Sequence, residues 1–403
     1  MNYIGSAARI DLTPQLDSPV IRGQHSRKAP ISVCHLVSGD AWGGAEAQLS
    51  ALMRSLSKRA ELNMSAIVLN EGRLAEELRD SCSDVRVIPE RQRSFWQIVA
   101  ETREFLRARN IQVVHAHRYK ENVIGALLAF HDPRLKLVKT QHGQTETLSG
   151  LAGAKQWLAH TIDRLTMRYA TNVVISVSSH LTEYLRRYVG DDRIAVIPNG
   201  IDLSRVNCEL SRAEAKKRLG IPEETPVVGS VGRLERGKRL DIFVHSAGEI
   251  LNQIPTTRFV IAGNGREEMS LHQLVADLGL SDQFIFLGYQ SDTSAILRAM
   301  DVLLITSDHE GLPMVLLEAM ALGTAVIARK VGGISEVLTD RQTGFLVDDR
   351  SPAALSHACV EALQNTKRTE NVACAARKLI ETNFLADHNG EHVSELYMSL
   401  VDR

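Results

Sequence analysis

The segment DVLLITSDHEGLPMVLLEAMAL occupies residues 301–322 and constrains the fold more than any other part of the chain. Its first residues, 301–305, form a short apolar run of strand length, which predicts a buried β-strand. Residues 314–322 predict a helix, opened by Pro313 because proline is favoured at the first helical position. The segment therefore predicts one strand-to-helix turn.

This turn is a candidate anion site. In a parallel sheet such turns lie at the carboxyl ends of strands, where ligands bind, and a helix start offers unpaired N–H groups and a positive dipole end. We expect a phosphate at the amides of Gly311, Leu312 and the neighbours of Pro313. Glu310 and Glu318 could each accept paired hydrogen bonds from vicinal hydroxyls. A nucleotide sugar has this pattern, with vicinal hydroxyls on either side of its phosphate groups.

The two glutamates also have a simpler explanation. Acidic residues near helix starts are common because they interact favourably with the helix dipole, so Glu310 and Glu318 could both be solvated. Glu318, however, lies within the otherwise apolar run 315–322. An acid in such a run must face a polar partner or a cleft, which favours the site.

With seven residues between Glu310 and Glu318, the segment resembles the E-x7-E motif of the retaining glycosyltransferases of family 4, the glycosyl transferases group 1. The resemblance continues through residues 324–328, 331–336 and 343–347 and extends over most of the chain. It implies the GT-B fold, in which two Rossmann-like domains face each other across a cleft. It also implies that Glu310 holds the donor sugar and that Glu318 holds the ribose.

Short β-branched or apolar runs alternate with helical patterns, which predicts parallel βα units rather than a β-sandwich. A first series of predicted strands comprises residues 31–37, 65–69, 85–88, 112–115, 135–140, 172–176 and 194–197. A second series comprises residues 227–231, 259–262, 284–287, 302–305 and 325–328. We therefore expect an α/β protein with two doubly wound domains.

The turn cluster Pro198-Asn199-Gly200-Ile201-Asp202 ends the first series and predicts the domain boundary. An equivalent segment links the two domains in the family that the chain resembles. We expect a leader at 1–30, an acceptor-binding domain at 31–198 and a nucleotide-sugar-binding domain at 199–382. The resemblance implies that a final helix, at 383–403, packs back on the first domain.

Arg233 and Lys238 follow the predicted strand 227–231, in a strand-to-helix loop. Two cations at the carboxyl edge of a sheet suit a diphosphate, because arginine binds it through a bidentate fork and lysine as a point charge. Both could instead be exposed loop residues. The resemblance implies that they hold the donor diphosphate. One departure from the family is Arg239, where a glycine often follows the lysine.

Gly43 and Gly44 follow the first predicted strand and precede a predicted helix. Glycine lets the backbone approach a ligand closely, and the helix start favours an anion. A tight turn alone would also account for the pair. The resemblance implies that this loop lies over the donor phosphates and the acceptor.

His115, His117 and His142 lie at the ends of predicted strands. Their imidazoles could orient sugar hydroxyls or could be satisfied by backbone carbonyls. The resemblance implies that His117 points at the transferred sugar. No metal site is expected, because His115 with His117 and Asp308 with Glu310 do not supply three convergent ligands.

The composition is that of an ordinary globular protein, with 44% hydrophobic and 24% charged residues. Five cysteines, odd in number and without paired metal spacing, predict a reducing compartment and no disulfide framework. Residues 1–30 lack an apolar run and are expected to be poorly ordered, and no apolar run is long enough to span a bilayer. We expect a cytoplasmic protein without a nucleic-acid partner, and the oligomeric state is not indicated.

These residues together predict an enzyme that moves a sugar from a nucleoside-diphosphate sugar to a hydroxyl acceptor, with no cofactor. Cations at the expected diphosphate site would stabilise the charge that develops on the leaving group. UDP is favoured over GDP as the nucleotide, and the acceptor is expected to be a glycan or lipid-linked, as in bacterial surface polysaccharide synthesis. A nucleotide-sugar epimerase of similar fold and a catalytically silent partner subunit remain as alternatives.

An anionic membrane surface is a further expected partner. Residues 1–200 hold 26 Lys and Arg against 20 Asp and Glu, whereas the remainder holds 21 against 28. Within the basic half, the stretches 91–109 and 164–187 mix arginines with apolar residues, a combination that can hold a protein on anionic lipid at the inner face of the membrane. These apolar residues are Phe95, Trp96, Leu106, Leu165 and Leu185. For any one of them, the core face of a helix is the more frequent position.

Overall fold

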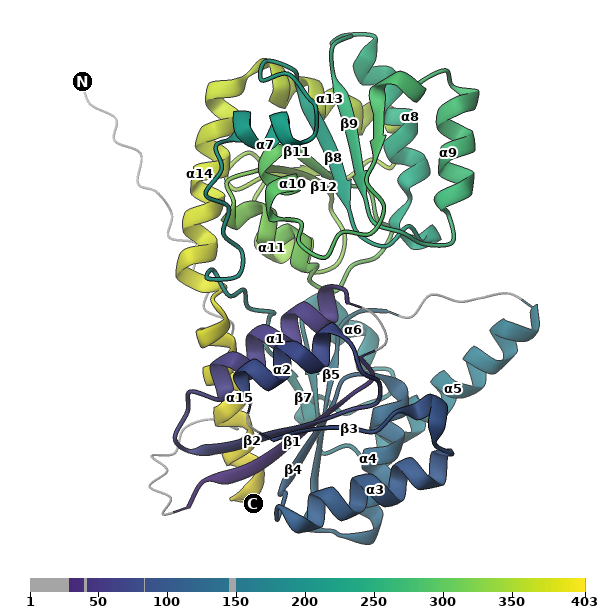
Figure 1. The fold of residues 1–403 in the computed structure, drawn as a ribbon, viewed down its shortest axis with the longest axis vertical. Helices are drawn as coiled ribbons and strands as arrows, with labels where there is room; N and C mark the ends of the chain where they lie inside the picture. Colours follow the sequence, from purple (N-terminus) through teal and green to yellow (C-terminus); the bar gives the residue numbers. More distant parts are fainter. Residues whose placement is uncertain (1–28, 40–41, 83, 145–149, 403) are drawn as a thin grey trace.

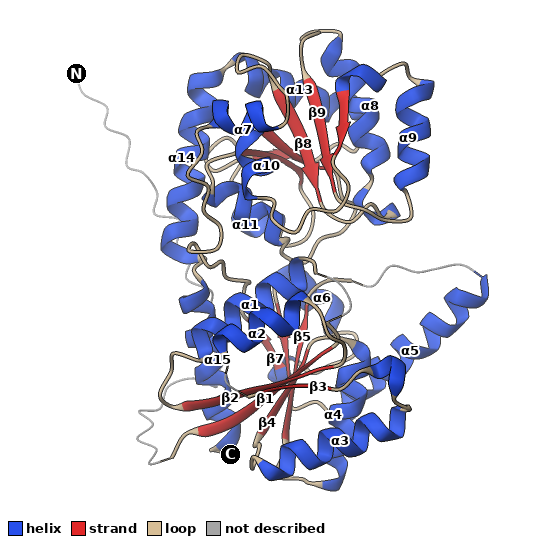
Figure 2. Ribbon diagram, in the orientation of Figure 1, coloured by secondary structure: helices blue, strands red, loops and turns tan. Residues whose placement is uncertain are grey.

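A computed structural model describes residues 29–39, 42–82, 84–144 and 150–402. The chain forms two α/β domains, one above the other in Figure 1, with the last two helices running along one side of both. The expected leader at 1–30 lies almost wholly outside the described residues. Both sheets are parallel and carry helices on their faces (Figure 2), so the expected α/β class is confirmed.

The first domain is built on a seven-stranded parallel sheet of order β3-β2-β1-β4-β5-β6-β7. Its strands are β1 (Ile31–Val37), β2 (Leu62–Val68), β3 (Val85–Val87), β4 (Val113–Ala116), β5 (Lys136–Gln141), β6 (Val173–Ser176) and β7 (Ile194–Val196). Its helices are α1 (Gly44–Leu56), α2 (Arg73–Ser81), α3 (Phe95–Ala108), α4 (Tyr119–His131), α5 (Gly150–Tyr169) and α6 (Ser179–Leu185), with 3₁₀ turns at Glu90–Gln92 and Asp191–Arg193.

The second domain is built on a six-stranded parallel sheet of order β10-β9-β8-β11-β12-β13. Its strands are β8 (Val227–Val231), β9 (Arg258–Ala262), β10 (Phe284–Phe286), β11 (Val302–Ile305), β12 (Ala325–Arg329) and β13 (Phe345–Val347). Its helices are α7 (Arg212–Arg218), α8 (Leu240–Leu251), α9 (Glu268–Asp277), α10 (Ser294–Ala299), α11 (Met314–Ala321), α12 (Ile334–Val337), α13 (Pro352–Gln364) and α14 (Thr366–Asn383), with 3₁₀ turns at Arg236–Lys238 and Ser281–Gln283.

Most strand predictions are confirmed to within a few residues, because central strands of a parallel sheet are buried on both faces and stand out as apolar runs. The edge strand β13 was missed. It is an apolar run of only three residues at the edge of the sheet.

Two chain segments cross side by side between the domains. After β7 the chain reaches Ile201, whose N–H donates to the carbonyl of Phe384 and whose carbonyl accepts from the N–H of Ala386. Helix α14 packs against α11 of the second domain, and the final helix, α15 (Ala386–Val401), packs against α1 of the first. The crossing therefore lies within the predicted turn cluster and between the last two helices.

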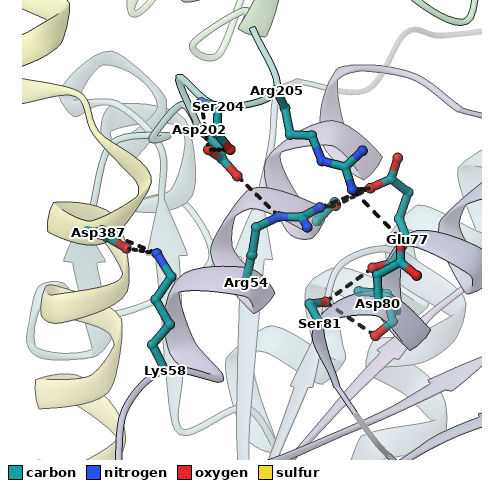
Figure 3. A network of polar contacts seen from close by, with 11 residues as sticks. Arg54, Lys58, Glu77, Asp80, Ser81, Asp202, Ser204, Arg205 and Asp387 are labelled. Atoms are coloured by element: carbon teal, nitrogen blue, oxygen red, sulfur yellow. Dashed lines mark hydrogen bonds and ion pairs between the residues drawn. The ribbon is translucent and has the colours of Figure 1, made fainter.

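Charged side chains tie this crossing to the first domain (Figure 3). Arg54 on α1 lies 3.1 Å from Asp202 and 3.0 Å from Glu77 on α2. Arg205, beyond the crossing, also reaches Glu77 at 3.1 Å, and Lys58 lies 3.2 Å from Asp387 on α15. The first crossing segment is thus held by α1 and α2, and the second by Lys58, just after the end of α1.

Among the described residues, no helix combines the length and the apolar character that crossing a membrane requires.

Candidate functional site

The loops after β8 and β11 bring the predicted cations and one glutamate together. Nζ of Lys238 lies 2.6 Å from Oε1 of Glu310, and the same oxygen accepts a hydrogen bond from Ser307 at 2.6 Å. The hydroxyl of Thr306 donates to the carbonyl of Lys238 at 2.8 Å, which fixes the two loops to each other. Lys238, Glu310 and Arg233 line one pocket.

Arg233 differs from Lys238 in having no ion pair. Its side chain is exposed, and within the described part of the chain no hydrogen bond or ion pair of its guanidinium is found. A neutralised lysine therefore lies beside a free arginine in the same pocket. The free guanidinium can bind an incoming anion through its bidentate fork without first leaving a partner.

Arg239, the departure from the family pattern, has a left-handed backbone with φ of 52°. Glycine adopts this conformation at little cost, whereas other residues are strained in it. Here the arginine keeps the turn and pairs with Asp241 at 3.0 Å and with Asp308 at 3.3 Å. Asp308 also pairs with the buried Arg329 at 2.5 Å. The departure thus changes the ion pairs beside the site and not the turn.

Glu318 lies within α11, beyond the loop that holds Glu310. Its side chain is half-buried, and its carboxylate has no partner among the described residues. Burial raises the pKa of this carboxyl to about 7, and the nearby Asp292 adds to the shift. Glu310, in contrast, is already paired. The two glutamates that the sequence treats alike therefore have different environments.

The start of α11 faces the other domain. The helix begins at Met314, and Pro313 is the residue before it. The prediction that Pro313 is the first helical residue is therefore wrong by one position. The apolar ring of Pro313 makes no cap hydrogen bond, and proline has no N–H of its own. Gly311 and Leu312 lie in the turn before it, and Leu312 is buried with its carbonyl accepting from Asn199 at 2.8 Å.

The two domains touch closely at Gly311. A Cβ atom at this position would lie 2.1 Å from the carbonyl oxygen of His142 in the first domain, so only glycine fits. Across the same boundary, both oxygens of Glu336 accept hydrogen bonds at 2.9 Å from the backbone N–H groups of Ser179 and His180, at the start of α6. The carboxylate of Glu336 in the second domain thus binds the start of helix α6 in the first domain.

Gly43 and Gly44 lie at the start of α1, with Gly43 preceding the helix and Gly44 as its first residue. A Cβ atom on Gly44 would lie 3.6 Å from the side chain of Met314, the first residue of α11. Two helix starts from different domains therefore meet here, and each brings unpaired N–H groups to the boundary.

The predicted His117 belongs to a buried group of imidazoles. Nε2 of His117 lies 3.0 Å from Nδ1 of His35, and Nδ1 of His117 lies 3.2 Å from Nε2 of His142. Neither nitrogen of His117 is left for a sugar hydroxyl in this arrangement. Nδ1 of His142 is buried and lacks a partner within the described residues.

Sequence reasoning missed His35. The ligand atoms of His35, His115 and His117 lie within 4.8 Å of one another, a grouping that could hold a metal ion. The argument against three convergent ligands considered only residues close in sequence. His35 and His115 both lie towards the carboxyl ends of predicted strands, at 31–37 and 112–115, but the sequence does not show that these two strands are neighbours.

The apolar residues of the expected membrane surface divide into two sets. Leu106 and Leu185 are buried core residues. Phe95 and Trp96 at the start of α3 and Leu165 on α5 are exposed, Trp96 to 68%. Both helices belong to the first domain, and α5 extends away from it in Figure 1.

Two family descriptions match the chain. "Glycosyl transferases group 1" matches residues 211–379, and "Glycosyltransferase Family 4" matches residues 42–205. Together they cover both domains.

Individual relatives are similar over most of the chain. The N-acetyl-alpha-D-glucosaminyl L-malate synthase of Bacillus anthracis is 26% identical over 307 residues, which is 75% of this chain and 79% of that protein. The UDP-Gal:alpha-D-GlcNAc-diphosphoundecaprenol alpha-1,3-galactosyltransferase of Escherichia coli is 26% identical over 307 residues, covering 74% and 78%.

Among solved structures, Alr3699/HepE of Anabaena in complex with UDP and glucose superimposes with a TM-score of 0.78. It is 23% identical, and the match covers 92% of this chain and all of that one. The GT-B fold is thereby confirmed.

Proposed function

The chain belongs to the glycosyl transferases group 1 family, and we propose that it transfers a sugar from a nucleoside-diphosphate sugar to a hydroxyl acceptor with retention of the anomeric configuration. The observation that carries this proposal is the single pocket that holds Arg233, Lys238 and Glu310 beside the start of α11. It combines a free cation, a hydrogen-bonded carboxylate and unpaired amides. Cations and amides suit a diphosphate, and a carboxylate suits the hydroxyls of a sugar.

Charge on the leaving group is the main chemical demand of the reaction. When the bond from the anomeric carbon to the phosphate oxygen breaks, negative charge builds on the nucleoside diphosphate. Arg233, Lys238 and the amides after Gly311 would stabilise it as preorganised positive groups. Lys238 can donate further hydrogen bonds to phosphate while it stays paired with Glu310, because an ammonium group has three N–H donors.

The two glutamates have separate roles in this proposal. Glu310 holds the donor sugar through its free oxygen, since Oε1 is already occupied by Lys238 and Ser307. Glu318 accepts the ribose hydroxyls, and its unpaired carboxylate supports that role. Neither glutamate acts as a nucleophile.

Retention follows if the acceptor hydroxyl attacks the face from which the diphosphate leaves. The acceptor oxygen then bonds to the anomeric carbon, the bond from that carbon to the phosphate oxygen breaks, and the hydroxyl proton passes to the departing phosphate. No separate base is needed, because the departing phosphate accepts the proton. Gly43 and Gly44, where α1 meets α11, would lie over the phosphates and admit the acceptor.

UDP is the proposed nucleotide and a glycan or lipid-linked alcohol the proposed acceptor. The Escherichia coli relative is named for a UDP-galactose donor and a diphosphoundecaprenol-linked acceptor, and the Anabaena structure was solved with UDP and glucose. These names support the donor class. Synthesis of a bacterial surface polysaccharide or glycolipid is the proposed setting, with the protein in the cytoplasm at the membrane face.

A panel of radiolabelled UDP- and GDP-sugars, assayed for nucleoside diphosphate release with and without acceptor extracts, tests the proposal. We expect release from at least one UDP-sugar, and a product whose anomeric configuration by NMR matches that of the donor. An epimerase would change the sugar without releasing the diphosphate. A silent subunit would do neither, and either result would contradict the proposal.

A further inference from the structure

A row of polar side chains continues the apolar core on one face of the first sheet. Successive residues on a strand point to opposite faces, so Val33 and His35 of β1 share a face, as do Val113 and His115 of β4. His35 pairs directly with His115 across the two strands. The valines pack in an apolar cluster with α15, and the histidines begin where that cluster ends, near the carboxyl ends of the strands.

These side chains form one continuous chain of hydrogen bonds. It runs from the hydroxyl of Thr140 to Nε2 of His115 at 2.7 Å, and from Nδ1 of His115 to the hydroxyl of Tyr397 at 2.5 Å. From Tyr397 it continues to Nε2 of His35 at 3.1 Å. It then passes through His117 at 3.0 Å to His142 at 3.2 Å. Tyr397 is the one member from α15, so the final helix completes the chain.

All four imidazoles are neutral at physiological pH. Burial lowers the pKa of His35 to about 3 and that of His142 to about 4, with Arg118 and Lys139 adding to the second shift. Burial also lowers the pKa of His115 and of His117 well below the usual value. A neutral imidazole has one N–H donor and one bare acceptor nitrogen. A ring that accepts a hydrogen bond at one nitrogen must therefore donate one from the other, so all hydrogen bonds along the chain of rings point the same way.

Tyr397 sets that direction because its hydroxyl carries a single proton. If it donates to His35, the N–H groups of the following rings all point away from it, and Nδ1 of His142 carries a proton. If it donates to His115, His35 donates to it from Nε2, His117 and His142 also carry their protons on Nε2, and Nδ1 of His142 is a bare acceptor. One proton position thus determines three tautomers.

The distances favour the second direction. To an oxygen acceptor, hydroxyl donors make shorter hydrogen bonds than N–H donors, with usual ranges of about 2.5–3.0 Å and about 2.7–3.2 Å, and we expect the same order for nitrogen acceptors. The 2.5 Å contact to His115 fits donation by the tyrosine hydroxyl, and the 3.1 Å contact fits donation by Nε2 of His35. Nδ1 of His142 then presents a lone pair, on the residue whose backbone carbonyl lies against Gly311.

We propose that Tyr397 is a positioning residue of the sugar site, because through His35 and His117 it fixes His142 as the tautomer whose Nδ1 accepts a hydrogen bond from a hydroxyl of the donor sugar. This inference rests on the proposed function for the identity of the hydroxyl. Being neutral, this nitrogen selects a hydroxyl and not a phosphate. The final helix thereby acts on the site without touching substrate.

Nitrogen-15 NMR of protein labelled at histidine tests the proposal, since long-range proton–nitrogen correlations show which ring nitrogen is protonated. Signals are assigned with His117→Asn and His142→Asn proteins. In the native protein, we expect His142 to be protonated at Nε2. In Tyr397→Phe, His35 loses its acceptor and His142 should become a mixture of tautomers. The kcat/KM for the nucleotide sugar should fall roughly three- to ten-fold, as for loss of one hydrogen bond, while the Kd of free nucleoside diphosphate stays unchanged.

Tyr184→Phe is the matched control. Its hydroxyl accepts from Arg164 at 3.4 Å in the same domain and outside the chain, so its removal should change neither the tautomers nor kcat/KM. Unchanged His142 signals in Tyr397→Phe, whatever the activity, would overturn the proposal. So would a lower Tm with unchanged kcat/KM, because the tyrosine would then only stabilise the fold.

Thr140→Val gives a second test if Tyr397→Phe does not fold. Without the Thr140 acceptor, His115 should move its proton to Nδ1 and donate to Tyr397, which must then donate to His35. The whole chain reverses, and His142 should become protonated at Nδ1. A Thr140→Val protein that keeps the native His142 tautomer contradicts the proposal. A different outcome is that the native protein shows the expected tautomers but releases no nucleoside diphosphate. That result would contradict the proposed function, and with it the assignment of the hydroxyl to a sugar.

Discussion

The two domains present opposite chemistry at their shared boundary. In the second domain, Arg233, Lys238 and Glu310 are charged, come from two loops and lie in an open pocket. In the first domain, the facing groups are neutral imidazoles such as His117, buried and linked by hydrogen bonds. The difference matches the two parts of the proposed donor, because a diphosphate is held by charge and a sugar by oriented neutral groups.

The largest effect is expected from removing the free cation of the charged region. Arg233→Ala should remove charge-assisted hydrogen bonds worth about 1.5–3 kcal/mol each, which corresponds to a loss of roughly ten- to a hundred-fold in kcat/KM per bond. The fold should be intact, because Arg233 has no bonded partner among the described residues. Steady-state kinetics and a thermal melt measure both quantities.

Arg236→Ala is the control for that change. Arg236 is an exposed arginine in the same loop and does not line the pocket. It should lose little activity. Native kcat/KM in a folded Arg233→Ala protein would show that the charged region does not bind the diphosphate.

A smaller effect should separate the two glutamates. Glu318→Gln should weaken binding of free nucleoside diphosphate by roughly ten-fold, as for a hydrogen bond to a charged group. Glu310→Gln should leave that affinity nearly unchanged and lower sugar transfer. Isothermal titration of the nucleoside diphosphate into both proteins measures the difference. Equal losses of affinity would mean that the two roles are wrongly divided.

The pKa of Glu318 predicts opposite signs for binding and stability. Because its folded pKa of about 7 lies above the usual 4.5, the ionised form costs stability above pH 7, and this cost disappears as the pH falls through 7 towards 4.5. Donation by ribose hydroxyls favours the ionised form, so nucleoside diphosphate affinity should rise with pH across the same range. Glu318→Gln should therefore raise the Tm of the free protein at pH 8 and remove the pH dependence of affinity. A lower Tm at that pH would contradict this.

The same contrast explains how much the sequence could predict. Glu310, Arg233 and Lys238 lie in short motifs soon after strands, so local patterns were enough to group these three residues. The two sheets were predictable because buried parallel strands are continuous apolar runs. Nothing in the sequence, however, shows that Lys238 and Glu310 form an ion pair and that Arg233 does not, since this depends on loop conformation.

The neutral region was predicted only in part. His117 was identified through the family resemblance, whereas His35, Thr140 and Tyr397 were not considered. They are separated by up to several hundred residues, and only the sheet order and the return of α15 bring them together. Pairing of β1 with β4 would have been needed to place His35 beside His115. Single-sequence patterns do not give that order.

A further, weaker effect concerns the outer face of the neutral domain. Trp96 on α3 and Leu165 on α5 are exposed beside basic residues, and Trp157 and Tyr169 extend the exposed apolar set on α5. The protein should bind vesicles that contain anionic lipid at low salt, release them at high salt and bind neutral vesicles little. Trp96→Ala should weaken binding a few-fold in a sedimentation assay.

Met269→Ala is the matched control for the vesicle assay, because Met269 is an apolar residue at least as exposed as Trp96 but lies on α9 of the second domain. Its loss should not change vesicle binding. Failure of the native protein to bind anionic vesicles at low salt would favour an acceptor free in solution and leave the exposed residues of α3 and α5 unexplained.

The smallest effect is expected from chelating divalent metal ions, which tests both regions together. In the charged region, the positive groups are side chains, and the nearest carboxylate, Glu310, is occupied by Lys238. In the neutral region, His35, His115 and His117 could form a metal site by proximity, but all six of their nitrogens already take part in hydrogen bonds. A metal ion would have to break that chain and release the protons it carries. Activity should therefore be unchanged after dialysis against EDTA, and added zinc should not alter the histidine NMR signals.

Loss of activity that magnesium or manganese restores would place a cation in the charged region. Zinc-dependent changes in the signals of His35, His115 and His117 would place one in the neutral region and would replace the hydrogen-bond chain as the explanation for their clustering.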